Sequence, residues 1–242
     1  MNRLVKCIHF QLKTMLRSSA IFIAIYFASI LVLQLFLTIS VSNSGSGSNS
    51  GFFIGGGIYI FIYVIANYKE MYNYLLMFGN TRKNIFLSNA IVSVMQSILF
   101  AAISVILILI GDIASRTFGF GQPGENSLIS LIYNGSSLAS EFIWLAAFFC
   151  MICSFSFIYG SLAYKFGNVF ITVFWVSFGL SFVAVPVLAE SNSGRLLVKA
   201  LSMFFSIGNP NGILLAPINF VIAAILLGMA SFAISRRQPQ TA

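Results

Sequence analysis

Six long apolar runs, almost free of charged side chains, constrain the fold of this chain more than any other feature. They occupy about residues 19–41, 52–68, 85–111, 139–163, 168–189 and 213–235, and Glu141 is the only acidic or basic residue within them. A helix needs about 20 apolar residues to cross a bilayer core, and a charge at its centre costs several kcal/mol. The polar alternation of transmembrane strands is absent. We therefore predict an all-α, polytopic membrane protein with six transmembrane helices.

The remaining composition excludes a soluble domain and a nucleic-acid partner. Of the 242 residues 59% are hydrophobic and only 7% are charged, too few to cover a soluble surface. The net charge of +8 is scattered between apolar runs and forms no basic patch. We expect a single transmembrane domain over residues 1–242, with an amphipathic cytoplasmic helix at 1–18, spans within 19–235 and a cytoplasmic tail at 236–242.

The positions of Lys and Arg predict the orientation of the spans. Basic residues concentrate on the cytoplasmic side of membrane proteins, and an even number of spans places both termini on one side. With both termini inside, ten of the 13 basic residues are cytoplasmic, and only Arg116, Arg195 and Lys199 lie outside. The ten are Arg3, Lys6, Lys13, Arg17, Lys69, Arg82, Lys83, Lys165, Arg236 and Arg237.

The first eighteen residues have the pattern of a helix that lies on a membrane surface. Arg3, Lys6, Lys13 and Arg17 fall within an arc of about 80° on a helical wheel. The apolar residues opposite are Leu4, Val5, Ile8, Leu12, Met15 and Leu16. Such a helix inserts its apolar face into the inner leaflet while its basic residues contact lipid phosphates or an acidic partner. The alternative is a topology anchor with no further role.

The connection between the second and third runs, residues 67–84, predicts a short helix and a tight turn. Met71, Tyr74, Leu75 and Phe78 recur at the spacing of one helical stripe. Gly79 is suited to end this helix, and Asn80 or Thr81 to cap the next. An apolar stripe facing the cytosol requires a cover, from a partner or from neighbouring helices of the same chain.

Two outer segments are expected to be something other than spans. Residues 112–138 contain Gly119, Gly121, Pro123 and Gly124, which argue against one continuous helix and favour a small cap. Residues 196–207 are apolar but too short to cross, and a turn at 209–212 ends them. We interpret them as a re-entrant or interfacial segment on the outer side.

Two motifs resemble chemical sites only superficially. Cys150 and Cys153 form a C-x-x-C pair, but intramembrane redox relays need a second cysteine pair, and only Cys7 remains. Helix packing by small residues is the better interpretation. The run 55–57 of three glycines lacks the Lys of a phosphate-binding loop and favours close helix approach.

The fifth run carries a phenylalanine every fourth residue, with Trp175 beside the series. The series comprises Phe166, Phe170, Phe174, Phe178 and Phe182. Successive steps of four sweep about 160° of the helix surface. These rings either face lipid, pack against other helices, or form one wall of a passage.

Three features of the chain together form a recognisable pattern: an amphipathic N-terminal helix, six spans, and a connection between the second and third spans that reads Tyr74-Leu-Leu-Met-Phe-Gly-Asn-Thr-Arg-Lys-Asn-Ile-Phe86. With these features the chain resembles the membrane subunits of small bacterial ABC exporters, the type-two ABC permease superfamily. The resemblance implies an elbow helix at the N-terminus and a coupling helix that docks on an ATPase. The docking residues would be Met71, Tyr74, Leu75, Phe78, Gly79, Thr81, Arg82 and Lys83. It also implies that the fifth span lines the cargo path, through Phe170, Phe174, Trp175 and Phe178.

The resemblance also predicts partners, because the chain contains no G-x-x-x-x-G-K-[ST] motif. ATP and Mg²⁺ would bind a separate ATPase subunit, and this chain would hold no cofactor and catalyse no reaction. A second copy or a sister permease would complete the pathway in the bacterial cytoplasmic membrane. We expect export of a hydrophobic or amphipathic cargo, such as a peptide, a lipid-like molecule or a drug. The rival function is a sensory or immunity subunit of an ABC-type complex without net transport.

Overall fold

The computed structural model describes residues 3–40, 51–118, 128–133, 137–167, 169–177, 192–209 and 211–236. Within these ranges all regular elements are helices. They are α1 (Arg3–Ser40), α2 (Gly51–Met77), α3 (Arg82–Phe118), α4 (Leu128–Tyr133), α5 (Leu138–Phe166), α7 (Asn192–Phe204) and α8 (Gly212–Arg236). Residues 169–177 form a further helical segment. The fold class predicted from the sequence is therefore confirmed as all-α.

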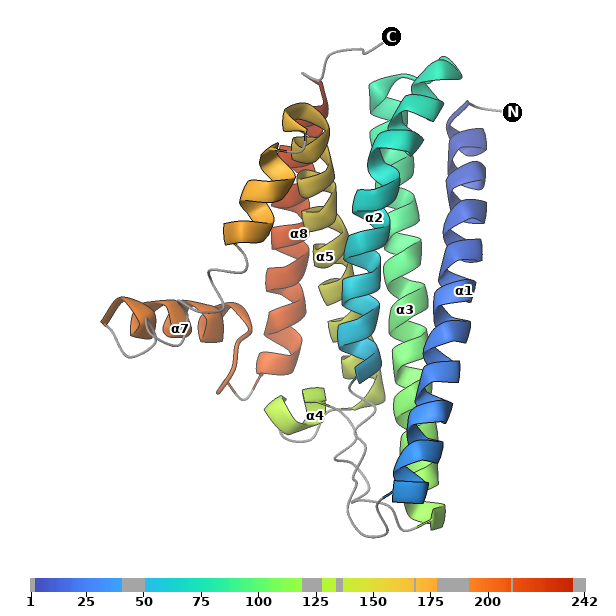
Figure 1. The fold of residues 1–242 in the computed structure, drawn as a ribbon. Helices are drawn as coiled ribbons and strands as arrows, with labels where there is room; N and C mark the ends of the chain where they lie inside the picture. Colours follow the sequence, from blue (N-terminus) through green and yellow to red (C-terminus); the bar gives the residue numbers. More distant parts are fainter. Residues whose placement is uncertain are drawn as a thin grey trace.

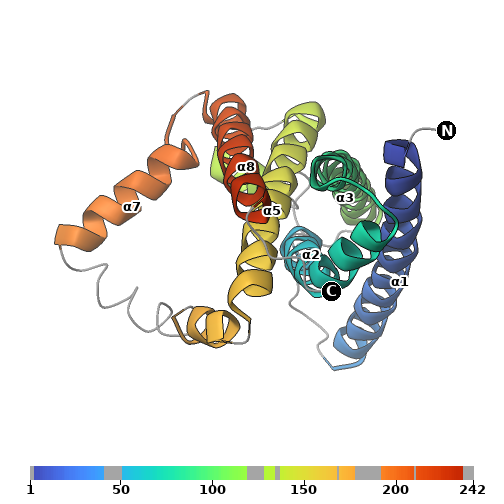
Figure 2. The same ribbon diagram turned by 90° about the horizontal axis from the view of Figure 1, so that it is seen from above.

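Five long helices run side by side and form the body of the molecule (Figure 1). Helix α5 lies at the centre, where it packs against α8, α2 and α3, and α1 packs along α3 at one edge. Viewed from above, α3 separates α1 from α5 (Figure 2). The described chain begins and ends at the same end of this bundle (Figure 1).

Large aromatic side chains fill the core between these helices. Phe100 of α3, Phe149 of α5 and Phe220 of α8 are fully buried. Glycines allow the neighbouring backbone to approach them: a Cβ on Gly56 would lie 3.1 Å from Phe100, and one on Gly57 would lie 3.0 Å from Ile152. The close helix approach predicted for residues 55–57 is thus confirmed at two of the three glycines.

Three helices of the described residues are long and apolar enough to cross a membrane. They are the part of α3 from Arg82 to Ile110, α5, and α8, which match the third, fourth and sixth predicted runs. The chain is therefore a membrane protein. The first two runs lie in α1 and α2 beside these helices, and residues 178–189 of the fifth run lie outside the described part.

The N-terminal segment differs from its prediction. Residues 3–40 form one continuous helix of 38 residues that runs along the bundle, with no break near residue 18 (Figure 1). Its buried face is a seam at four-residue spacing, composed of Cys7, Gln11, Met15 and Ser19. The predicted apolar face is mostly off this seam, because Val5 and Leu16 are exposed. The segment packs on α3 and does not form a separate helix lying across the bundle.

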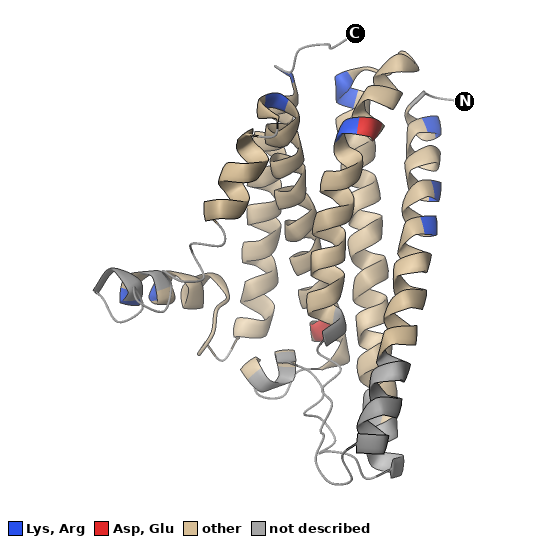
Figure 3. Ribbon diagram, in the orientation of Figure 1, with Lys and Arg blue, Asp and Glu red and all other residues tan. Residues whose placement is uncertain are grey.

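Lys and Arg residues gather at one end of the bundle (Figure 3). They come from the first half of α1, the last part of α2, the start of α3 and the last turns of α5 and α8. Two further basic residues, Arg195 and Lys199, lie on α7, away from this end. The buried Glu141 lies in the first turn of α5, at the opposite end of the bundle. We call the first of these ends the basic end.

Helix α7 lies across the bundle axis, near the end opposite the basic end (Figures 1 and 2). Its C-terminal part is tied to the bundle by hydrogen bonds: Asn219 of α8 donates to the Phe204 carbonyl at 2.9 Å, and Tyr133 of α4 donates to the Phe205 carbonyl. The crosswise placement agrees with an interfacial segment between the fifth and sixth runs.

Candidate functional site

The connection between α2 and α3 forms the predicted helix end and tight turn at the basic end. Gly79 has a φ of 70°, which favours glycine, and its N–H donates to the Leu76 carbonyl at 2.9 Å. The Asn80 N–H donates to the Leu75 carbonyl at 3.3 Å, which completes a Schellman-type cap. The Thr81 hydroxyl then accepts from the Asn84 N–H at 3.3 Å and caps α3. The sequence predictions for Gly79 and Thr81 as capping residues are confirmed.

The apolar stripe predicted in this connection divides into an exposed and a buried part. Tyr74 is 44% exposed, Phe78 is 63% exposed, and Met77, which the sequence prediction omitted, is 84% exposed. Leu75 is only 3% exposed because it packs with Cys7, Tyr72 and Ile85. Of the predicted docking residues, Leu75 is therefore buried inside the chain, whereas Tyr74 and Phe78 are exposed.

An exposed group of apolar side chains, which we call the apolar tip, remains at the basic end. It consists of Phe10, Tyr74, Met77 and Phe78. The Phe10 ring of α1 stacks on Tyr74 at a centroid distance of 5.0 Å, and Tyr74 contacts Phe78 at 4.6 Å. Met71 is half-buried behind this group, Arg82 is half-buried, and Gly79, Thr81 and Lys83 are exposed.

Hydrogen bonds tie the base of the apolar tip to α5 and α8. The Tyr72 hydroxyl donates to the Ser235 carbonyl at 3.4 Å, and the Arg82 guanidinium donates to the Arg236 carbonyl. The Tyr164 hydroxyl of α5 donates to the Asn73 side chain at 2.9 Å. Burial raises the pKa of Tyr72, although Arg82 partly opposes this, so the hydroxyl stays protonated and able to donate. These hydrogen bonds thus hold the connection to two other helices, α5 and α8.

The basic residues predicted to contact the membrane surface lie on α1. Lys6, Lys13 and Arg17 are exposed and off the seam that packs on α3. Arg3 begins the helix, and its side chain lies outside the described part. The three exposed bases remain free to face lipid phosphates.

Two of the aromatic residues predicted to line a cargo path, Phe170 and Phe174, lie against α5. Phe174 meets the buried Tyr159 edge to face at 4.4 Å, and Phe170 contacts the same ring at 5.3 Å. Trp175 is exposed and meets Phe174 at 5.8 Å, and Phe178 lies outside the described residues. The contacts of Phe170 and Phe174 favour the packing alternative.

A long apolar groove, missed by the sequence analysis, lies between α3 and α8 with α5 as its floor. It encloses about 920 Å³ and runs from Arg82 and Ser235 at the basic end to Phe142 and Pro217 at the other. Cys150, half-buried, lines it, whereas Cys153 is buried with its Sγ 3.8 Å from the Ser97 hydroxyl. Nothing local in the sequence marks the groove, because its residues come from four helices: α3, α5, α8 and, through Tyr68 and Tyr72, α2.

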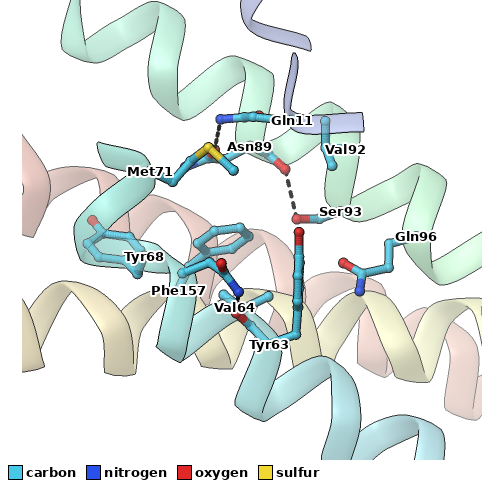
Figure 4. Close-up of a pocket in the computed structure, with 11 residues that line it drawn as sticks. Gln11, Tyr63, Val64, Tyr68, Met71, Asn89, Val92, Ser93, Gln96 and Phe157 are labelled. Atoms are coloured by element: carbon cyan, nitrogen blue, oxygen red, sulfur yellow. Dashed lines mark hydrogen bonds between the residues drawn. The ribbon is translucent and has the colours of Figure 1, made fainter. Parts of the chain in front are cut away.

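A second, smaller cavity of about 50 Å³ lies among α1, α2, α3 and α5 (Figure 4). Its polar lining comprises Gln11, Tyr63, Asn67, Tyr68, Asn89, Ser93 and Gln96. The Gln11 amide donates to the Asn89 side chain at 2.6 Å across the contact between α1 and α3. The Gln11 Oε1 and Gln96 Nε2 atoms are buried without a hydrogen-bond partner among the described residues. Such atoms cost about 1–3 kcal/mol each when unsatisfied.

No group of three or more His, Cys, Asp or Glu side chains that could hold a metal ion occurs among the described residues. Comparisons of the chain with protein-family models, curated proteins and solved structures find no match.

Proposed function

We propose that this chain is the membrane subunit of an ATP-driven exporter of the type-two ABC permease kind. It has six spans with both termini in the cytoplasm and moves a hydrophobic or amphipathic cargo out across the bacterial cytoplasmic membrane. A separate ATPase binds ATP and Mg²⁺, and a second permease copy or a sister permease completes the pathway.

The observation that carries this proposal is the exposed apolar tip at the basic end. Contiguous apolar side chains rimmed by charge mark a surface that another protein covers. Tyr74, Met77 and Phe78 form such a surface beside Lys83. The positive-inside rule assigns the basic end to the cytosol, where an ATPase has access to it.

The hydrogen bonds below the tip support coupling between a docked ATPase and the spans. Displacement of the tip is transmitted to α8 through the Tyr72–Ser235 and Arg82–Arg236 bonds. A packed bundle responds to such a displacement by switching between discrete arrangements. ATP-driven movement of the partner would therefore change the access of the membrane half.

The apolar groove supports a lipid-like or amphipathic cargo. Its walls are mostly aliphatic and aromatic, and Arg82 at the basic end can neutralise an anionic group. We propose the groove as the first candidate for the cargo surface. The second candidate for the cargo surface is the set predicted from the sequence, Phe170, Phe174, Trp175 and Phe178. It ranks lower because Phe170 and Phe174 pack on Tyr159, which leaves less of their rings available to a cargo.

Photocrosslinking at position 78 tests the proposed docking. A photoreactive phenylalanine analogue replaces Phe78 in the tagged full chain expressed in its own host, and the adduct is identified by mass spectrometry. We expect a protein that contains a P-loop, and we expect Phe78→Asp to remove that protein and its ATPase activity from the purified complex. Phe166→Asp is the matched control, because Phe166 is also an exposed phenylalanine, at the last turn of α5.

Two results would contradict the proposal. If Phe78 forms no adduct with an ATPase, or if the Phe78→Asp complex keeps full ATPase activity, the apolar tip is not the docking site. A complex that hydrolyses ATP but moves no amphipathic cargo in proteoliposomes would favour the sensory or immunity subunit instead.

A further inference from the structure

Two of the side chains that line the small cavity each carry a buried polar atom without a hydrogen-bond partner among the described residues. Gln96 is 2% exposed and its amide Nε2 lacks an acceptor, whereas Gln11 is 3% exposed and its Oε1 lacks a donor. Both side chains line the same cavity, from helices α3 and α1. In Figure 4 the labelled side chains of four helices surround this space.

The position of Gln96 along α3 places an unpartnered polar atom far from the helix end, where hydrogen-bond partners are scarce. Gln96 lies fourteen residues after the start of α3, about 21 Å along the helix, within the predicted third span. Polar side chains in spans normally satisfy one another by hydrogen bonds between helices. Gln11 and Asn89 form such a bond, but Gln11 Oε1 and Gln96 Nε2 have no partner among the described residues.

The pairing of one unsatisfied donor with one unsatisfied acceptor discriminates between ligands. The Gln96 Nε2 atom can only donate and the Gln11 Oε1 atom can only accept, so a ligand that bridges the two must both accept and donate. Water donates and accepts, and it satisfies both. A cavity needs about 10–15 Å³ to hold one water, so about 50 Å³ suffices for a small cluster.

We infer that this cavity is a water-binding site within the membrane part of the bundle, in which a small cluster of ordered waters bridges Gln96 of α3 to Gln11 of α1. Tyr63, Asn67 and Met71 of α2 lie one turn apart along its wall and lead from Gln96 toward the basic end. The waters thus join three helices. Hydrogen bonds through water can break and re-form as the helices move, whereas direct side-chain contacts would hold them in one arrangement. This inference does not depend on the proposed transport function.

Radiolytic footprinting of the full chain in lipid nanodiscs tests this inference. X-ray pulses convert bound waters into hydroxyl radicals, which oxidise the side chains that the waters touch. We expect Met71 and Tyr63 to be oxidised faster than Met151 and Tyr26, which are also half-buried but do not line the cavity. We expect Gln96→Leu to reduce the rates at Met71 and Tyr63 to those of the controls.

Two results would overturn the inference. Oxidation of Met71 and Tyr63 in the unmodified chain at the rates of Met151 and Tyr26 would show that the cavity is dry; this comparison needs no variant and holds if Gln96→Leu fails to fold. A thermal stability that rises with Na⁺ or K⁺, but not with choline at equal ionic strength, would assign the cavity to a cation.

Discussion

At the scale of single residues, the bundle depends on positions where a side chain has no room. Gly160 of α5 lies in close contact with α2, because a Cβ there would lie 2.8 Å from the Tyr68 ring. Tyr68 is itself buried and stacks on Tyr72, at the base of the apolar tip. A change at Gly160 must therefore displace the aromatic rings that support the connection between α2 and α3.

We expect Gly160→Ala to lower the free energy of unfolding by about 1–3 kcal/mol, the usual cost of overpacking. Gly228→Ala in α8 is the matched control, since its Cβ would meet nothing within 4 Å. That change should be neutral or stabilising by up to about 1 kcal/mol, because alanine favours helix. Thermal unfolding of the two purified variants in one detergent measures the difference, and equal melting temperatures would contradict the tight contact.

At the scale of helices and their connections, α7 is held mainly by its C-terminal end. Tyr133 of α4 donates to the Phe205 carbonyl and accepts from Trp144 at 3.3 Å, so one hydroxyl links α4, α5 and the end of α7. Burial raises the pKa of Tyr133, which keeps the hydroxyl protonated as a donor. The Phe204 and Phe205 rings also pack on Phe220.

We expect Tyr133→Phe to loosen α7, because it removes two hydrogen bonds worth about 0.5–1.5 kcal/mol each. Trypsin should then cleave faster after Arg195 and Lys199, which are exposed on α7. Ser202→Ala serves as control, because the Ser202 hydroxyl bonds only to the Lys199 carbonyl of the same helix. Unchanged cleavage in Tyr133→Phe would mean that the aromatic packing alone holds α7.

The sequence predicted where helices end better than it predicted which residues of other helices pack against them, because capping is local and packing is not. Capping by Gly79 and Thr81 depends on backbone chemistry within a few residues, which the sequence contains directly. The burial of Leu75 depends on Cys7 and Ile85 from other helices, and the Gln11–Asn89 bond joins residues 78 positions apart. Such contacts have no local pattern.

One error of prediction had a usable local signal. The segment 3–40 contains no glycine or proline, so nothing in it breaks a helix between the amphipathic part and the first apolar run. The charge pattern alone suggested two elements. The structure instead forms one helix, whose seam of Cys7, Gln11, Met15 and Ser19 was concealed by the mixture of polar and apolar side chains.

Across the whole protein, most basic residues lie at the same end of the bundle as the two ends of the described chain. The basic residues of five helices gather where the described chain begins and ends, as the counts along the sequence predicted (Figure 3). The orientation relative to the membrane stays a prediction from the positive-inside rule.

We expect single cysteines placed at Ser46 and at Thr81 to react from opposite sides of the membrane. In a background without Cys7, Cys150 and Cys153, an impermeant maleimide added to intact cells should label position 46 and spare position 81. Permeabilised cells should label position 81 as well, because Thr81 is exposed. Labelling of position 81 in intact cells would reverse the orientation and remove the apolar tip from contact with an ATPase.

The continuity of α1 has a mechanical consequence. At about 1.5 Å per residue its 38 residues extend about 57 Å, well beyond a hydrocarbon core of about 30 Å. Phe10 near its start stacks on Tyr74 in the apolar tip, so a protein pressed against the tip also presses on α1. A helix without a hinge moves as a rigid rod. When one end of α1 tilts, its other end therefore moves by a distance that grows with the tilt angle and the helix length. The first helix therefore links events at the apolar tip to the opposite end of the bundle without any change in its own fold.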